Sequence, residues 1–121
     1  MYHEEYRKKN SLEKRINETK YIKEKYPNHV PILLSCSNDI FIEKHKYIIP
    51  SSLSITEFLF IIRKRMHPKL ENGEALFCFI GENDIIPRYS ASIGEYYLKE
   101  KYIDNYLLLR IQKENTFGDS K

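Results

Sequence analysis

The side chains that most often perform catalysis or bind metals are sparse in this sequence and form no reactive pattern. Cys36 and Cys78 stand alone, so neither a zinc site nor a redox pair is expected. The four histidines have no metal-ligand spacing, and the chain lacks a nucleophile elbow, a Walker-type loop and a glycine-rich dinucleotide loop. We therefore expect no enzyme, no metal and no cofactor, and isolated cysteines fit a reducing, cytoplasmic compartment.

Basic clusters are the second candidate for binding chemistry. Arg7-Lys8-Lys9, Lys14-Arg15 and Arg63-Lys64-Arg65 could contact tubulin or a nucleic acid. The formal net charge is only +3, however, and charge runs on helices are usually solvated faces. A basic tubulin- or nucleic-acid-binding module is kept as an alternative function, but we do not expect nucleic acid to be a partner.

The length and composition indicate one folded domain. The 121 residues fit the roughly 100 to 150 residues of a typical domain, and 41% hydrophobic with 31% charged residues is ordinary globular usage. The first ten residues contain no apolar run, and the longest run, Phe58–Ile62, is too short to cross a bilayer. We expect neither a secretion signal nor a membrane helix.

A helix is predicted near the N-terminus. Either Asn10 or Ser11 can cap it, Glu13 is placed to complete a capping box on Asn10, and Lys25 is its last residue before a proline. We expect residues 1–25 to form a helical extension of the domain.

Two further helices are predicted from capping boxes. Ser54 and Glu57 precede the apolar run Phe58–Ile62, and the three basic residues that follow suit the last turn of a helix. The same pattern begins at Ser92 and predicts a short helix that reaches about Lys101.

Short β-prone runs predict the strands that these helices must accompany. The runs are residues 30–34, 46–49, 76–80, a short one at 85–87, and 106–111. Strands and helices that alternate in one small domain favour an α+β sheet with a helix across one face. A hairpin, a crossing helix and a last strand inserted centrally describe the ubiquitin-like β-grasp, with the N-terminal helical segment as an addition.

Several segments together resemble the autophagy ubiquitin-like modifiers, the family of GABARAP and the microtubule-associated protein light chains. Their order and spacing carry the resemblance, which covers about residues 4–118. The segments are Leu12–Arg15, Lys25–Pro31, Lys46–Ser51, Phe60–His67, Ala75–Phe77, Ile86–Pro87 and Ser90–Gly94. Extra residues around 70–73 and 82–84 fall in predicted loops, where insertions cost little.

The resemblance implies a cleavage and conjugation site near the C-terminus. In the family, a cysteine protease removes a tail after a glycine, which here is Gly118, with Phe117 before it and Asp119 after it. Activating and conjugating enzymes would then join the Gly118 carboxylate to phosphatidylethanolamine, and a residue without a Cβ suits their narrow active sites. The implied parts are a helical extension (1–25), a ubiquitin-like domain (26–118) and a removable tail (119–121).

The resemblance also implies a face that binds short peptides of cargo receptors and adaptors by extending the sheet at its second strand. A pocket for an aromatic side chain would be lined by Glu18, Ile22, Pro31, Leu33, Lys46, Ile48 and Tyr106. A pocket for an aliphatic side chain would be lined by Tyr47, Ile49, Pro50, Leu53, Phe58, Ile61 and Arg65. Alternation along the second strand would separate the two sets. The alternative is that Ile22, Leu33, Phe58 and Ile61 are ordinary core residues.

Two residues of the aromatic pocket, Ile48 and Tyr106, are expected to be exposed. Tyr106 stands where the family more usually has phenylalanine, so its hydroxyl must stay hydrated or find a partner. We expect this hydroxyl to disfavour deep insertion of a tryptophan side chain.

The implied location is the cytoplasm, with attachment to the autophagosome membrane after lipidation. The same fold in organelle maintenance or vesicle trafficking remains an alternative to bulk autophagy.

Overall fold

A computed structural model of the chain describes residues 1–71 and 73–114. The predicted cleavage site, Gly118 with Phe117 and Asp119, therefore lies outside the described residues. Within the described part, no helix combines the length and apolar composition that crossing a bilayer requires.

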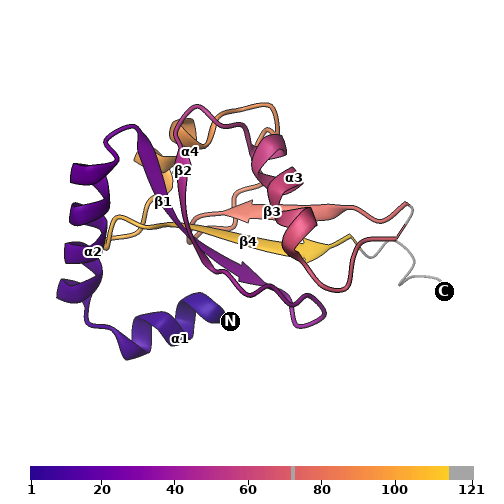
Figure 1. The fold of residues 1–121 in the computed structure, drawn as a ribbon, viewed down its shortest axis with the longest axis horizontal. Coiled ribbons are helices and arrows are strands. Elements are labelled where there is room, and N and C mark those ends of the chain that lie inside the picture. Colours follow the sequence, from indigo (N-terminus) through magenta and orange to yellow (C-terminus); the bar gives the residue numbers. More distant parts are fainter. Residues whose placement is uncertain (72, 115–121) are drawn as a thin grey trace.

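Four strands form one mixed sheet. In chain order they are β1 (His29–Cys36), β2 (Lys46–Pro50), β3 (Leu76–Ile80) and β4 (Leu107–Lys113). Their order in the sheet is β2-β1-β4-β3, and the central pair β1 and β4 is parallel while both outer pairs are antiparallel. The last strand is thus inserted at the centre, which confirms the predicted β-grasp arrangement (Figure 1).

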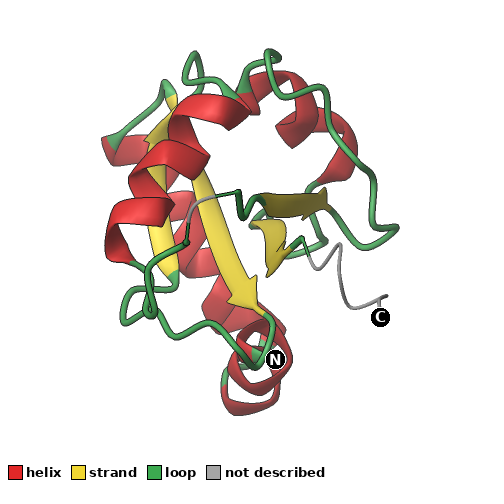
Figure 2. Ribbon diagram, turned by 90° about the vertical axis from the view of Figure 1, so that its right-hand side faces the viewer, coloured by secondary structure: helices red, strands yellow, loops and turns green. Residues whose placement is uncertain are grey.

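Within the described residues four helices accompany the sheet, and Figure 2 shows helices on either side of the strands. They are α1 (Tyr2–Lys9), α2 (Leu12–Lys25), α3 (Ile55–Arg65) and α4 (Ile93–Glu100). The two N-terminal helices lie together near β1, and β3 and β4 extend away from them (Figure 1).

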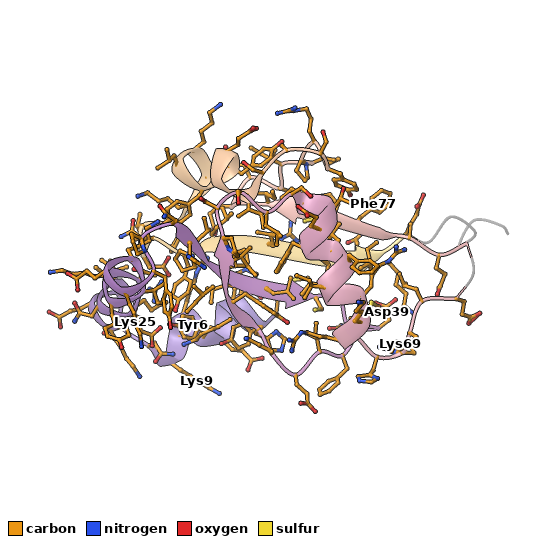
Figure 3. The ribbon with its side chains drawn as sticks, turned by 45° about the horizontal axis from the view of Figure 1, so that its top comes forward. Tyr6, Lys9, Lys25, Asp39, Lys69 and Phe77 are labelled. Carbon is orange, nitrogen blue, oxygen red and sulfur yellow. The ribbon has the colours of Figure 1, made fainter. Side chains whose placement is uncertain are left out.

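The sequence alternation of the central strands produces two apolar layers, because successive strand residues point to opposite faces. On one face, a large core joins the sheet to α3 and α4 through Ile32, Leu34, Leu107, Leu109, Phe58, Ile62, Ile93 and Tyr97. On the other face, Leu33 and Leu108 pack with Tyr6 of α1 and with Tyr106. Figure 3 places Tyr6 among the side chains between the N-terminal helices and the sheet, whereas Lys9 lies at the periphery.

The helix caps agree with the sequence in part. Ser54 and Glu57 form both hydrogen bonds of the predicted capping box, at 3.0 and 2.9 Å. The prediction of a capping box on Asn10 is wrong: Ser11 caps α2 and accepts a hydrogen bond from the Lys14 amide. Because the cap lies one residue later, Lys14 rather than Glu13 occupies the position that a capping box requires.

Three local predictions need correction. Residues 1–25 contain two helices, and the break between them falls at Asn10 and Ser11. The expected short strand at residues 85–87 reduces to a single bridge between Ile80 and Ile85. β1 continues to Cys36 because the backbone there pairs with the parallel strand β4, a contact that local sequence does not reveal.

Ion pairs from Arg7 of α1 and from Arg15 of α2 help to fasten the N-terminal helices to the domain. The Arg7 guanidinium donates two hydrogen bonds to the Glu82 carboxylate, at 2.9 and 3.0 Å. Arg15 of α2 reaches Asp104 at 2.6 Å in a buried pair. The two N-terminal helices therefore pack on the face of the sheet opposite α3.

Candidate functional site

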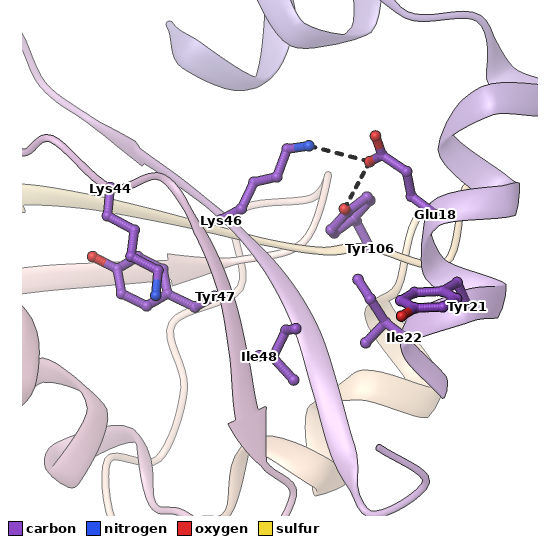
Figure 4. A pocket seen from close by; sticks show the side chains of 8 residues that line it. All are labelled: Glu18, Tyr21, Ile22, Lys44, Lys46, Tyr47, Ile48 and Tyr106. Atoms are coloured by element: carbon purple, nitrogen blue, oxygen red, sulfur yellow. Dashed lines mark hydrogen bonds and ion pairs between the residues drawn. The ribbon is translucent and has the colours of Figure 1, made fainter. Parts of the chain in front are cut away.

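A cavity of about 450 Å³ lies between α2 and β2. Five of the seven residues predicted for the aromatic pocket line it, and Figure 4 shows their side chains, which come from α2, from β2 and from the residue before β4. These are Glu18, Ile22, Lys46, Ile48 and Tyr106. Residues distant in sequence thus meet at one concave, largely apolar site.

The local structures of α2 and β2 explain this convergence. Glu18 and Ile22 are four residues apart on α2, so they share one face of the helix. Lys46 and Ile48 are two residues apart on β2, so they point to the same side of the strand. Tyr106 immediately precedes β4 and supplies the floor beneath them.

One carboxylate organises the polar contacts of the cavity. Glu18 Oε1 accepts hydrogen bonds from the Tyr106 hydroxyl at 3.0 Å and from Lys46 Nζ at 3.2 Å, and these two are the dashed lines of Figure 4. The Tyr6 hydroxyl of α1 donates to the same oxygen. One carboxylate oxygen of α2 is therefore shared by side chains from α1, from β2 and from the residue just before β4.

This arrangement shifts the ionisation of its members. Partial burial alone would raise the pKa of Glu18, but the hydrogen bonds from Tyr6, Tyr106 and Lys46 outweigh it and hold the pKa below its ordinary value. Burial, followed by the neighbouring Tyr6 and Glu18, raises the pKa of Tyr106. At neutral pH the cavity thus holds an ionised carboxylate and a neutral phenol.

The expectation that Tyr106 is exposed is wrong, whereas that for Ile48 is confirmed. Tyr106 is 1% exposed because its ring lies edge-on against Tyr6 and its hydroxyl is used by Glu18, while Ile48 is 40% exposed. Pro31 and Leu33 are also buried, and neither lines the cavity wall. Leu33 belongs to the apolar layer beneath Tyr106, so the alternative of ordinary core describes it better.

Three residues line the cavity beyond those predicted for the aromatic pocket: Tyr21, Lys44 and Tyr47. Tyr21 could have been found from its spacing, because it is three residues after Glu18 on the same helical face. Tyr6 does not line the cavity, but it contacts three of the residues that do. Its hydroxyl bonds to Glu18, its ring packs edge-on against Tyr106, and the Lys46 ammonium lies 4.4 Å from its ring centre. No sequence spacing indicates these contacts between different elements.

The residues predicted for the aliphatic pocket lie around the junction of β2 and α3. Tyr47, Ile49 and Phe58 are buried in the main core, and the Tyr47 ring packs edge-on against Phe58. Leu53 and Ile61 are half-buried, and Pro50 and Arg65 are exposed. Phe58 is therefore an ordinary core residue, as the alternative had it. The aliphatic pocket remains a prediction, and the more accessible of its predicted residues are the ones that could contact a peptide.

The backbone of β2 offers a second kind of binding group. β2 is an outer strand of the sheet and pairs only with β1 among the described strands. An edge strand presents unpaired N–H and C=O groups that can pair with an extended peptide. Because Ile48 and Lys46 project from this strand into the cavity, a peptide on the edge could also place side chains there.

Comparisons with known proteins identify relatives of this chain. Residues 14–118 match the family model described as autophagy protein Atg8, ubiquitin-like. The chain is 39% identical over 111 residues to autophagy-related protein 8 of Schizosaccharomyces pombe, covering 89% of this chain and 88% of the relative. It is 35% identical over 116 residues to autophagy-related protein 8 of Mycosarcoma maydis, covering 93% of this chain and 95% of the relative.

Solved structures of Atg8 proteins also match the fold of this chain. The crystal structure of Trypanosoma brucei ATG8 matches with a TM-score of 0.76 and 28% identity, covering 90% of this chain and 93% of the other. Plasmodium falciparum Atg8 in complex with a P. falciparum Atg3 peptide matches with a TM-score of 0.73 and 28% identity, covering 88% and 93%.

Proposed function

Because the chain belongs to the Atg8 family of ubiquitin-like autophagy proteins, we propose that it is a modifier that becomes attached to membrane lipid and recruits peptide-bearing partners. A cysteine protease removes residues 119–121, and activating and conjugating enzymes join Gly118 to phosphatidylethanolamine. The chain then passes from the cytoplasm to the autophagosome membrane. The two acyl chains of such a lipid suit stable retention, since a single chain gives only marginal membrane binding.

The cavity beside an unpaired strand edge is the observation that carries the recruiting role. The β2 edge can supply backbone hydrogen bonds to an extended peptide, and the cavity between α2 and β2 can accept one large apolar side chain. Lys44 and Lys46 line the same cavity and favour acidic residues next to that side chain. Cargo receptors and adaptors with a short aromatic and aliphatic motif have this chemistry.

The complex of Plasmodium falciparum Atg8 supports a further partner. That protein is seen with an Atg3 peptide. We propose that the corresponding conjugating enzyme of this chain also presents a peptide segment to the edge of β2, so that one site serves both conjugation and recruitment.

Peptide titration tests the recruiting role. Ile48→Asp places an unpaired charge in the cavity wall and should weaken binding of a peptide with an aromatic anchor by about tenfold or more. Ile86→Asp is the matched control, because Ile86 is also exposed but does not line the cavity. Equal affinities of both variants in calorimetry would contradict docking at this cavity.

Intact-mass spectrometry tests the conjugation role. In an autophagy-competent cell extract, the parent chain should lose the mass of residues 119–121 and then gain that of a phospholipid in the membrane fraction. Gly118→Ala should remain full length and unattached. If the parent chain also stays full length, the conjugation mechanism is wrong even where peptide binding persists.

A further inference from the structure

A second concave surface lies on the other side of α2. It is a groove of about 520 Å³ between α2 and α4, which we call the α2–α4 groove. Lys20, Lys23 and Glu24 line it from α2, Tyr97 and Leu98 line it from α4, and Lys101 lines it from the residue that follows α4. α2 therefore forms a ridge between this groove and the cavity described above, which Glu18, Tyr21 and Ile22 line.

Helical spacing explains the composition of the groove. Lys20, Lys23 and Glu24 are three and four residues apart, so they fall on one face of α2. Tyr97 of α4 and Lys101, the residue that caps the end of this helix, lie across the groove from them. This face is turned away from the aromatic cavity, so a ligand of the groove would occupy a separate site.

Positive charge gathers over an aromatic floor in this groove. The ammonium groups of Lys23 and Lys101 lie 5.0 and 5.4 Å from the centre of the same Tyr97 ring. Lys23 Nζ also donates a hydrogen bond to the His29 carbonyl oxygen at 2.9 Å, which holds this lysine in place. Glu24 is the acidic residue among the lining residues, so three lysines face one carboxylate.

The charges of the groove are not neutralised within the described residues. Among residues 1–71 and 73–114, neither Lys20, Lys23 nor Lys101 forms an ion pair with a carboxylate. Apolar surface is also left without cover, because Leu98 is 77% exposed at the edge of the groove. Unpaired cations beside an exposed leucine fit a ligand that carries both negative charge and an apolar side chain.

We propose that the α2–α4 groove binds an acidic peptide segment of a partner protein, with an aliphatic or aromatic side chain of that segment against Tyr97 and Leu98. Tyr97 is 6% exposed at the base of the groove, a depth that an extended peptide can reach and a flat membrane surface cannot. The lysines orient the acidic residues, and Leu98 gains cover. This site does not depend on the proposed lipid conjugation.

Titration of the isotope-labelled full chain with a defined probe tests this assignment. The probe is a peptide of about ten residues, long enough to cross the groove in extended form, with one central leucine among Asp and Glu. Its control replaces the acids with Asn and Gln. The acidic probe should shift the amide resonances of residues 19–24 and 97–101, and the neutral control should not.

Variants decide whether the groove itself is responsible. The double variant Lys20→Gln with Lys101→Gln keeps the hydrogen bond from Lys23 to the His29 carbonyl oxygen. It should lower the affinity for the acidic probe by about tenfold. Lys8→Gln with Lys9→Gln removes the same charge from exposed positions of α1 and should leave affinity within about twofold. Equal weakening by both double variants would show nonspecific charge attraction and overturn the proposal.

Two further outcomes separate this site from its alternatives. Ile48→Asp should leave binding of the acidic probe unchanged, and loss of binding would place the probe in the aromatic cavity and overturn the groove assignment. Vesicles of phosphatidylcholine with phosphatidylserine should shift none of these resonances. If the vesicles do bind, and the double variant Lys20→Gln with Lys101→Gln no longer binds them, the ligand of the groove is a membrane surface instead.

Discussion

At the level of single residues, Glu18 both lines the cavity and accepts the hydrogen bonds of its polar side chains. Its Oε1 accepts hydrogen bonds from Tyr6, Tyr106 and Lys46, so this oxygen is already used before any ligand arrives. A ligand with an indole N–H would have to compete with those donors. A phenylalanine side chain has no such donor and requires only the apolar wall.

Tyr106→Phe tests this competition. The variant removes one donor from Glu18 and should therefore bind a tryptophan-containing peptide about tenfold more tightly than the parent, which is roughly the worth of one hydrogen bond to a charged group. Isothermal titration calorimetry of both proteins provides the measurement. A peptide with phenylalanine in the same place is the control, since its affinity should not change. Equal tryptophan-peptide affinities would dispose of the idea.

The ionisation of Glu18 leads to a prediction about pH. Because the pKa of this carboxyl is lower in the folded protein than its ordinary value, ionised Glu18 stabilises the fold above that ordinary value, and this contribution is lost as pH falls through the folded pKa. Glu18→Gln should therefore unfold at lower urea concentration than the parent near neutral pH. The difference should shrink as pH falls below the ordinary pKa of a glutamate carboxyl, about 4.3. A difference that stays constant with pH would contradict a role for the charge.

At the level of elements, the capped helix α3 is the part of the fold most directly encoded in local sequence. Ser54→Ala removes the side-chain acceptor of the Glu57 amide and should lower the free energy of unfolding by about 1 kcal/mol. Ser52→Ala is the matched control, because Ser52 is exposed and lies outside the helix, and it should change stability little. Urea denaturation of the two variants measures the contrast, and equal losses would mean that the cap contributes nothing specific.

The other elements differ in how far sequence could predict them. The bounds of β3 follow from a single apolar run and agree with the prediction, since that signal is local. α1 has one buried residue, Tyr6, and no apolar stripe, so its helix was not predicted separately. Its position depends on distant partners such as Ser35, which accepts a hydrogen bond from the His3 amide at 3.0 Å.

The same limit applies to the candidate site. Alternation along β2 buries Tyr47 and Ile49 and leaves Ile48 exposed, because that pattern is local. Tyr47 nevertheless also lines the cavity beside Lys46 and Ile48. How deeply a residue is buried depends on distant parts of the chain, and so the burial of Tyr106 could not be predicted, whereas that of Leu33 was one of two alternatives. It depends on α1 and α2 covering that face of the sheet, which only the assembled fold reveals.

At the level of the whole molecule, a buried ion pair joins the N-terminal helices to the β-grasp domain. Asp104 is 0% exposed, pairs with Arg15 at 2.6 Å and also accepts a hydrogen bond from the Tyr106 amide at 2.9 Å. The Thr19 hydroxyl of α2 donates to the Asp104 carbonyl oxygen at 2.8 Å. The helical extension and the floor of the cavity are thus stabilised by the same residue.

Arg15→Met should consequently destabilise the entire chain rather than release the helices alone. It leaves the Asp104 carboxylate buried without its cation, a change that typically costs about 3 to 5 kcal/mol. Arg88→Met breaks an exposed pair with Glu95 and should cost no more than about 1 kcal/mol. Urea unfolding followed by circular dichroism and by tyrosine fluorescence should give one coincident transition for each variant. Two separate transitions would mean that residues 1–25 fold independently, because only then could α2 detach while the sheet kept its core.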